Sequence, residues 1–255
     1  MLTKYQLDKL VKKHKIDKSV ILREYIQILV LNKVYSFSKS SKIFFKGGTC
    51  IHLIYKGQRF SEDLDFTVNL EEDDFLEFIK IPFKELEKEN GFLIKEKKSI
   101  SGKDFLLSYK NDLVNGDVFI KLDFSFREKI LDPKKCIIET DFPVVFKGFI
   151  NCLSEEEILS EKIRAILTRD KGRDVYDLWY LLSLGNKLNY EFINKKLKFY
   201  DLILADNKEI IDKINKLDKK TFVLDLKPFV SINEREKLGD FYEYIKQFVL
   251  NNVEY

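Results

Sequence analysis

Two carboxylates alternate with apolar residues in the segment 63–68, which reads Asp-Leu-Asp-Phe-Thr-Val. Strict alternation predicts a β-strand, because successive side chains of a strand point to opposite faces of the sheet. Asp63, Asp65 and Thr67 then share one face, and the other face is apolar. Neighbouring carboxylates repel each other, so the pattern favours a cation bound between them.

A third carboxylate lies on a later segment of the same kind. Residues 117–127 also alternate, which puts Lys121, Asp123 and Ser125 on one face of a second strand. If this strand neighbours 63–68, three carboxylates converge, and such a set can hold two Mg²⁺ or Mn²⁺ ions that clamp a triphosphate for in-line attack. The same alternation also describes the solvated face of an antiparallel sheet, so the strands alone leave both interpretations open.

A glycine pair precedes the first of these strands. Gly47, Gly48 and Thr49 stand between a short β-type run, 42–45, and a short helical pattern, 50–55. Glycines let backbone N–H groups approach a phosphate closely, and a helix N-terminus adds partial positive charge. Tight turns need glycine for steric reasons alone. The position of Thr49, 14 residues before Asp63, makes the combination more specific than either motif.

The elements that must position these residues divide the sequence into two halves. The first forty residues and 71–90 have helical patterns, while 104–110 and 117–127 predict a β-hairpin around the Asn115-Gly116 turn signal. Pro133 and Pro143 bracket a last, weak β region. We therefore predict an α+β fold, with an α+β domain over residues 1–150 and a helical domain over 151–255.

The second half begins at a capping-box signal. Ser154 is followed three residues later by Glu157, so the serine side chain should cap the helix while Glu157 reaches back. The periodicity predicts a series of helices from there to the C-terminus, over residues 155–169, 173–184, 189–199, 206–217 and 237–253.

Composition excludes several classes of protein. The chain has 255 residues, 45% of them hydrophobic, with 45 Lys+Arg against 42 Asp+Glu and a net charge of +3. It is thus neither disordered nor a general polyanion binder, and any site for a polyanion must be local. The charged N-terminal segment lacks the apolar core of a signal peptide, and no run approaches the length of a membrane span. Cys50, Cys136 and Cys152 are isolated in sequence, which fits neither a disulfide framework nor a zinc site. We expect a cytoplasmic protein.

The motifs around the glycine pair resemble those of a known family. Residues 45–49 (FKGGT) and 59–66 (RFSEDLDF) are similar to the AbiEii nucleotidyltransferase family, toxins of AbiE-type toxin–antitoxin and abortive-infection systems related to the MenT toxins. The family belongs to the DNA polymerase β-like superfamily, in which Gly-Ser or Gly-Gly precedes Asp-x-Asp and a third aspartate, here Asp123, lies on a later strand. Gly48-Thr49 replaces the usual Gly-Ser, which is a mild departure.

The resemblance continues in the helical half and covers roughly residues 40–185. Residues 161–165 (EKIRA), Arg169 and 173–178 (RDVYDL) are similar to downstream family motifs that hold a functional lysine and a functional aspartate. Lys162 and Arg169 lie on one helical stripe, and such cations suit phosphate binding. The alternative is a solvated helix face with an i,i+4 ion pair between Arg173 and Asp177, worth only about 0.3–0.5 kcal/mol.

The resemblance implies a nucleotidyltransferase-type mixed sheet with flanking helices, a C-terminal helical bundle and a metal-dependent reaction. Gly47, Gly48 and Thr49 would hold the nucleotide phosphates. Asp63 and Asp65 would bind Mg²⁺, with Mn²⁺ as a substitute. A nucleoside monophosphate would pass from an NTP to RNA, with a tRNA 3′ end as the expected acceptor.

The remaining roles follow from the same resemblance. Asp123 would complete the metal site or activate the acceptor hydroxyl, Lys162 would neutralise the triphosphate, and Arg169 and Asp174 would assist in nucleotide binding and catalysis. A cognate antitoxin is an expected partner, although a direct complex is not required. Two alternatives stay open: transfer to a protein side chain, and a non-catalytic module that binds a nucleotide or an antitoxin.

Other cations have two interpretations each. Arg59, just before the metal-binding strand, could contact phosphate or form a structural ion pair. The lysines at 195–198 and 219–220 could hold an RNA backbone or simply increase solubility.

Overall fold

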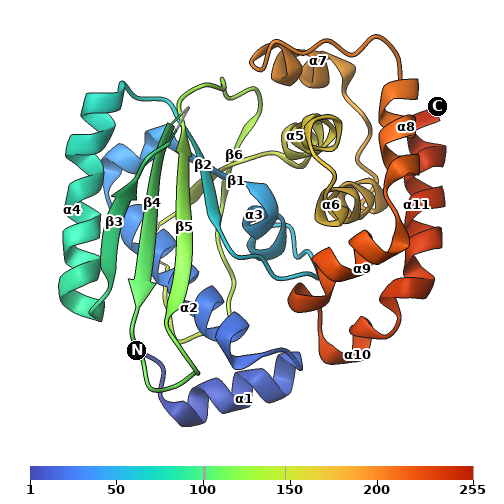
Figure 1. Ribbon diagram of the computed structural model, residues 1–255. Helices are drawn as coiled ribbons and strands as arrows, with labels where there is room; N and C mark the ends of the chain where they lie inside the picture. The colour runs from blue at the N-terminus through green and yellow to red at the C-terminus, as the bar shows by residue number, and fades with distance from the viewer. Residues whose placement is uncertain (100–101, 147, 255) are drawn as a thin grey trace. The chain divides into compact units, whose positions relative to one another are not determined.

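The computed structural model describes residues 1–99, 102–146 and 148–254, and the chain divides into two units (Figure 1). The sheet unit comprises Met1–Lys56 and Phe60–Leu153, and the helical unit comprises Gly57–Arg59 and Ser154 to the C-terminus. The chain therefore passes from one unit to the other after Lys56, after Arg59 and after Leu153. The predicted halves 1–150 and 151–255 did not include the assignment of Gly57–Arg59 to the helical unit.

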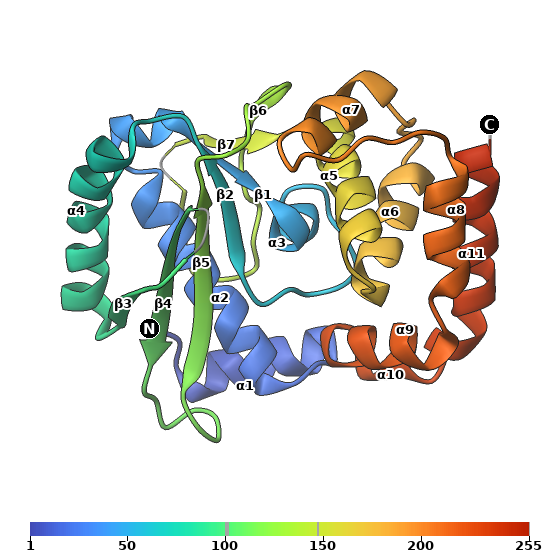
Figure 2. The same cartoon turned by 45° about the horizontal axis from the view of Figure 1, so that its top comes forward.

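Within its described residues, the sheet unit contains a seven-stranded mixed sheet in the order β3-β4-β5-β2-β1-β7-β6. The neighbours β5, β2 and β1 can be followed in Figure 2. The β2–β5 and β1–β7 pairs are parallel, and the other pairs are antiparallel. The strands are β1 Ile43–Lys46, β2 Leu64–Val68, β3 Leu93–Lys97, β4 Gly102–Tyr109, β5 Val118–Ser125, β6 Pro133–Cys136 and β7 Ile150–Leu153.

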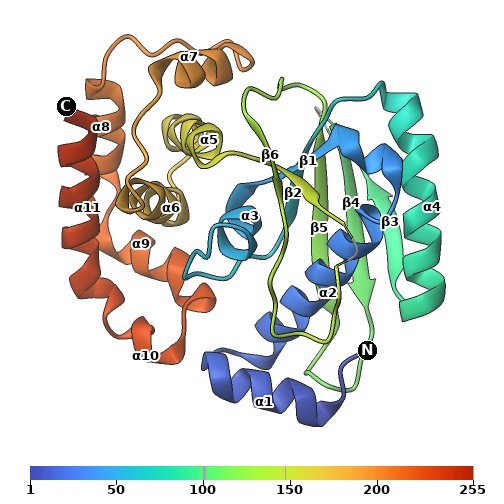
Figure 3. The same cartoon turned by 180° about the vertical axis from the view of Figure 1, so that it is seen from behind.

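Helices cover the apolar face of this sheet. The rings of Phe66 on β2 and Phe124 on β5 stack at 4.7 Å between centroids, and Phe75 of α4 lies 4.7 Å from Phe124. Helix α2 contacts both α4 and β5, and it crosses the sheet on the side seen in Figure 3. The opposite face is thereby left to the polar side chains. The helices of the unit are α1 Lys4–His14, α2 Lys18–Val34, α3 Gly47–Leu53 and α4 Glu72–Asn90, with a 3₁₀ turn at Ser38–Lys42.

The predicted α+β class is confirmed, and so are the strand 63–68, the helix 71–90 and the hairpin of β4 and β5. Two strands were not predicted. β3 is an edge strand of mostly exposed, charged residues, so it lacks an apolar face that alternation could reveal. β7 is a four-residue buried run within the segment predicted as the domain boundary, and its parallel partner β1 lies far away in sequence.

Strand pairing brings together two cysteines that are isolated in sequence. Cys136 on β6 and Cys152 on β7 belong to antiparallel neighbours, and their Sγ atoms lie 3.0 Å apart. Both are free thiols, as is the buried Cys50. The spacing in sequence gives no signal of this contact, because it depends on the register of two strands.

The helical unit packs its helices around α5 and α6. Helix α5 contacts α6, α7 and α8, and α11 contacts α6, α8 and α9. The five predicted helices are confirmed, whereas the short α9 and α10 were missed. No helix in the described part of the chain is long and apolar enough to cross a membrane. The helices are α5 Glu155–Thr168, α6 Gly172–Ser183, α7 Tyr190–Lys198, α8 Lys208–Lys216, α9 Lys219–Leu226, α10 Ile232–Arg235 and α11 Leu238–Glu254, with a 3₁₀ turn at Lys227–Phe229.

The start of α5 follows only half of the predicted capping box. The Ser154 side chain accepts a hydrogen bond from the backbone N–H of Glu157 at 3.2 Å. The Glu157 carboxylate, in contrast, pairs with the Lys196 Nζ at 2.7 Å, and both side chains are fully buried. Lys196 also lies 3.0 Å from Glu161. Within the run 195–198, Lys196 is therefore neither an RNA contact nor a solubilising lysine.

Candidate active site

Asp65 and Asp123 lie side by side on the polar face of the sheet. β2 and β5 are parallel neighbours, and these two residues are partners in their register. Register partners place their side chains on the same face at short range. The alternating residues beside them, Leu64, Leu122 and Phe124, are completely buried on the opposite face. Burial of that apolar face fixes the direction in which the carboxylates point.

The row of charged residues extends to both neighbouring strands. Lys46 at the end of β1 is the register partner of Asp65, and Asp104 on β4 is the register partner of Asp123. Asp65, Asp123 and Asp104 thus form a carboxylate row across three adjacent strands. Asp104 had not been singled out from the sequence, although it lies in a predicted strand, because the register between strands is not a local property.

A lysine lies between two members of the carboxylate row. The Lys121 Nζ is 2.9 Å from Oδ2 of Asp123 and 3.0 Å from Oδ2 of Asp104. Burial by itself lowers the pKa of Lys121, but the hydrogen bond and charge of Asp123, together with those of Asp104, raise the pKa above its ordinary value of 10.5. Lys121 therefore carries its positive charge at neutral pH.

Gly47 lies directly against the carboxylate of Asp65. A Cβ atom at position 47 would stand 2.2 Å from Asp65 Oδ2, far inside contact distance, and the residue has φ of +79°. Both features require glycine, because an L side chain would collide and would be strained at this φ. Gly47 is the first residue of α3, so the predicted turn is the first turn of the helix itself.

Thr49 ties α3 to the start of β2. Its side chain is completely buried, and its hydroxyl donates a hydrogen bond to the backbone carbonyl of Asp63. The hydroxyl thus positions the strand that carries the carboxylates. Gly48 is buried beside it.

The three predicted metal ligands are only partly brought together. Asp65 and Asp123 are adjacent, while Asp63 lies one residue before β2 begins. In the described ranges, no three acidic, histidine or cysteine side chains are already gathered as a metal site. The pairing of Asp123 with Lys121 gives a physical reason, since two adjacent carboxylates without a metal ion repel each other and take up an available cation. The residues present fit a divalent ion: their donors are carboxylate oxygens, and a positive charge is already held there.

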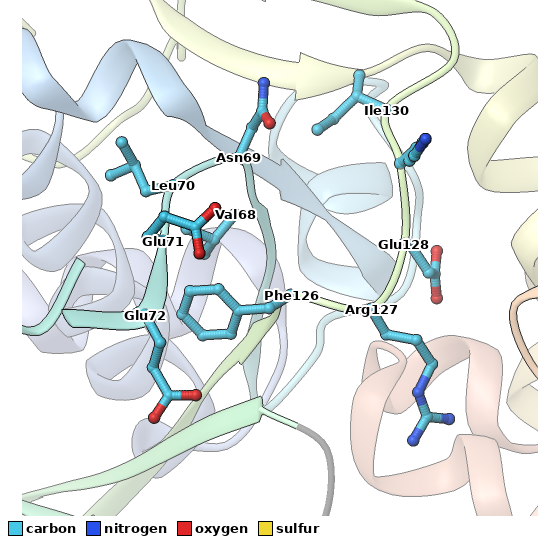
Figure 4. A pocket seen from close by; sticks show the side chains of 10 residues that line it. Val68, Asn69, Leu70, Glu71, Glu72, Phe126, Arg127, Glu128 and Ile130 are labelled. Atoms are coloured by element: carbon cyan, nitrogen blue, oxygen red, sulfur yellow. The ribbon is translucent and has the colours of Figure 1, made fainter. Parts of the chain in front are cut away.

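A pocket of about 740 Å³ opens beyond the carboxyl ends of β2 and β5 (Figure 4). Glu128 lines it, and this buried carboxylate lies 3.4 Å from the Nζ of Lys46, the register neighbour of Asp65. Glu128 thus connects the pocket lining with the carboxylate row by its contact with Lys46, while Asp65, Asp104 and Asp123 do not line the pocket. Its lining residues are Val68, Asn69, Leu70, Glu71, Glu72, Phe126, Arg127, Glu128, Lys129 and Ile130.

The predicted residues of the helical unit form a second charged group. The Lys162 Nζ lies 3.1 Å from Asp174 Oδ1 and 2.7 Å from Asp177 Oδ2. Arg59 donates through Nε and Nη2 to the two carboxylate oxygens of Asp177, each at 2.6 Å. The Nε of Arg169 lies 2.7 Å from Asp174 Oδ2. We call these five residues the helical ion cluster.

Most of the helical ion cluster is buried. The exposed fraction is 7% for Lys162, 4% for Arg59 and 1% for each of the two aspartates, whereas 59% of the Arg169 side chain is exposed. The solvated-face interpretation is therefore wrong for Lys162. In place of the alternative pair of Arg173 and Asp177, Asp177 contacts Arg59 and Lys162. Arg59 thus forms the structural ion pair that was one of its two interpretations.

The cluster perturbs the ionisation of its aspartates. Burial raises the pKa of Asp177, but the charges and hydrogen bonds of Arg59 and Lys162 outweigh it and hold the pKa below the ordinary value of 3.8. Asp174 has a lowered pKa for the same reason, with Lys162 and Arg169 as the cations. Three cations face two carboxylates, so the formal charge of the cluster is +3 − 2 = +1.

Comparison with solved structures relates the fold to two proteins. It is similar to the nucleotidyltransferase toxin MenT4 from Mycobacterium tuberculosis, with a TM-score of 0.70 and 16% identity over 98% of this chain and 90% of that chain. It is also similar to JHP933 from Helicobacter pylori, with a TM-score of 0.55 and 20% identity over 94% of this chain and 95% of that chain. At these identities the likeness concerns the fold alone. No curated protein sequence matches the chain.

A family match carries the comparison beyond the fold. The sequence profile described as "Nucleotidyl transferase AbiEii toxin, Type IV TA system" matches residues 31–244, which is most of the chain. The matched range includes the carboxylate row, Gly47 and all five members of the helical ion cluster. The resemblance found from the short motifs is thus confirmed by a match of much greater length. The chain belongs to the AbiEii family of nucleotidyltransferase toxins of type IV toxin–antitoxin systems.

Proposed function

We propose that this nucleotidyltransferase moves a nucleoside monophosphate from an NTP to RNA in a reaction that depends on Mg²⁺, with the sheet carboxylates as the metal site. One observation carries the proposal: Asp65 and Asp123 are register partners on adjacent parallel strands, with Gly47 against Asp65. Two neighbouring carboxylates on one sheet face repel each other, and a bound cation relieves this repulsion.

The metal site would be formed by Asp65 and Asp123, with Asp63 as a third ligand, and Mn²⁺ could replace Mg²⁺. A bound divalent ion would neutralise charge on the triphosphate and favour in-line displacement at the α-phosphorus. The carboxylate of Asp123 would also accept the proton of the acceptor hydroxyl as that oxygen attacks. Pyrophosphate is the leaving group.

The phosphates of the nucleotide are proposed to lie against Gly47 and Gly48. The absence of a side chain at Gly47 lets its backbone lie directly beside the Asp65 carboxylate. Thr49 would act indirectly, because its hydroxyl fixes the start of β2 through the Asp63 carbonyl. It is a positioning residue in this proposal.

Lys162 and Arg169 are proposed to offset negative charge on the triphosphate, and Asp174 to hold both cations in place. The contacts of Asp174 with the two side chains and the formal charge of +1 on the helical ion cluster support this assignment. The burial of Lys162 keeps its ammonium in a fixed position. A cation held in place loses little conformational entropy when it meets a phosphate.

The acceptor is proposed to be the 3′ end of tRNA, in the cytoplasm. This choice rests on the family, whose members are toxins, because a modified tRNA end would stop translation. A cognate antitoxin is the expected partner, without a requirement for a direct complex. Transfer to a protein side chain is the second candidate, since the same carboxylates would serve it.

The test is a transfer assay with each α-³²P-labelled NTP, purified total RNA and Mg²⁺. Wild type should label an RNA of tRNA size, and the label should be sensitive to ribonuclease but not to protease. Asp65→Asn should not label, whereas Asp117→Asn, which removes an exposed aspartate just before β5, should label normally. Protease-sensitive label would favour the protein acceptor. Equal labelling by wild type and Asp65→Asn would contradict the metal site.

A further inference from the structure

We propose that Lys121 is a built-in competitor of the metal ion for Asp123, and that Asp104 holds Lys121 when the metal binds. The two residues together would set the metal affinity of the site. The inference rests on the proposed metal site. Its observational basis, however, is a separate one, namely the contacts of Lys121 and the different exposure of its two partners.

Lys121 is placed between two carboxylates at nearly equal distances. It precedes Asp123 by two residues on β5, so both side chains share the polar face, and Asp104 is the register partner of Asp123 on β4. The Nζ atom lies 2.9 Å from Asp123 and 3.0 Å from Asp104. Lys121 can therefore give up the first contact and keep the second.

The two carboxylates differ in their access to solvent. The exposed fraction of the side chain is 36% for Asp123 and 14% for Asp104. An arriving ion meets Asp123 more readily, while the more buried Asp104 has the greater need of a fixed counter-charge. The Lys121 side chain is itself 43% exposed and flexible, so it has room to follow Asp104.

Two other lysines near the carboxylate row contact carboxylates outside it. Lys46, which faces Asp65, has the buried Glu128 as a partner at 3.4 Å. Lys103, the other lysine near this part of β4, pairs with Glu72 and Glu96. Lys103 alternates with Asp104 along the strand, so it belongs to the opposite face of the sheet. It provides a matched control for the removal of one positive charge.

The functional consequence concerns the state without metal. Asp65 and Asp123 would repel each other if both were uncompensated, and Lys121 supplies the missing charge. A metal ion must displace the Lys121 ammonium from Asp123, which reduces the apparent metal affinity. Because Asp104 retains the displaced ammonium, the reduction is smaller. We therefore expect the affinity to rise when Lys121 is removed and to fall when Asp104 is removed.

The test is titration of the full-length protein with Mn²⁺ alone, monitored by the electron paramagnetic resonance signal of free Mn²⁺. Lys121→Met should bind Mn²⁺ roughly three- to tenfold more tightly than wild type, the scale of one part-exposed ion pair. Asp104→Asn should bind Mn²⁺ more weakly than wild type. The same substitution should reduce the Mn²⁺ affinity clearly less in a Lys121→Met background. Lys103→Met and Asp117→Asn should change the affinity less than twofold.

Three results would overturn or redirect the inference. Unchanged or weaker binding by both Lys121→Met and Lys121→Gln would overturn it, provided that circular dichroism shows both folded. If Asp104→Asn reduces the Mn²⁺ affinity by the same factor in the Lys121→Met background as in wild type, Asp104 is itself a metal ligand. That result also overturns the inference. Wild type that binds no Mn²⁺, or Asp65→Asn that binds as wild type does, would refute the underlying metal site instead.

Discussion

The two groups of aspartates in this molecule differ in the number of cations that they contact and in their exposure to solvent. In the carboxylate row, Asp104 and Asp123 share one ammonium, that of Lys121, and Asp123 is 36% exposed. In the helical ion cluster, Asp174 and Asp177 meet three cations and are 1% exposed. Carboxylates that are short of cations and accessible can take up a divalent ion. Carboxylates that are buried and fully paired hold the fold together, and they hold their cations in place.

The largest expected effect separates these two groups by activity. Asp65→Asn should reduce kcat/KM for nucleotide transfer by about 10³-fold or more, since a metal ligand contributes several kcal/mol to the transition state. The free energy of unfolding should stay the same or rise, because a repulsion between neighbouring carboxylates is removed. Steady-state kinetics and urea unfolding on the same sample measure both. A large loss of stability together with activity would place Asp65 with the structural aspartates instead.

The next effect is on the stability of the helical unit. Asp177→Asn leaves Arg59 and Lys162 buried beside an uncharged partner, which should destabilise the protein by about 3–5 kcal/mol. Urea unfolding gives the value. Asp170→Asn is the control, because that side chain is 70% exposed and pairs with Lys213 at 3.3 Å, so its removal should cost less than about 0.5 kcal/mol. Similar losses in the free energy of unfolding for the two variants would mean that burial of the cluster does not increase the contribution of its ion pairs to stability.

A pair of glycine variants sharpens the role of the contact at Asp65. Gly47 and Gly91 have φ of +79° and +70°, but only a Cβ at Gly47 would collide with Asp65. Both alanine variants should lose about 1–2 kcal/mol of stability from backbone strain. Gly47→Ala should in addition lose about 10²-fold in kcat/KM, because a displaced ligand weakens the site. Equal activities would show that the position of the Asp65 carboxylate is not critical.

The smallest effect is the pH dependence of stability. Asp174 and Asp177 have a lower pKa in the folded protein than the ordinary value of 3.8. Their contribution is therefore complete above the unfolded-state pKa and is lost as the pH falls through it toward the folded-state value. Wild type should lose about 1–2 kcal/mol between pH 5 and pH 3 from these groups. Asp177→Asn should show a shallower decline in urea unfolding at the two pH values, and an equal decline would contradict the shift.

The local part of this structure was predictable from the sequence. Period-two alternation identified the strands that carry Asp65 and Asp123, because burial of one sheet face imposes that pattern on the residues themselves. The helical pattern over 71–90 likewise marked α4, which ends where Gly91 adopts the left-handed conformation.

The non-local part was not predictable. Asp104 became visible as a neighbour of Asp123 only through the register of β4 and β5. The ion pair of Arg59 with Asp177 joins residues 118 positions apart, and Lys196 reaches Glu161 across 35 positions. Charged residues are most often solvated, so a buried ion pair can be predicted only when its distant partner is known.

The most direct test of the metal site is the anomalous scattering of Mn²⁺ in crystals of the wild-type protein soaked with the ion. The account predicts a peak at about 2.0–2.2 Å from carboxylate oxygens of Asp65 and Asp123, with Lys121 displaced from Asp123. It predicts no peak at Asp174 or Asp177. A Mn²⁺ peak at those two aspartates, with none at Asp65 and Asp123, would contradict it.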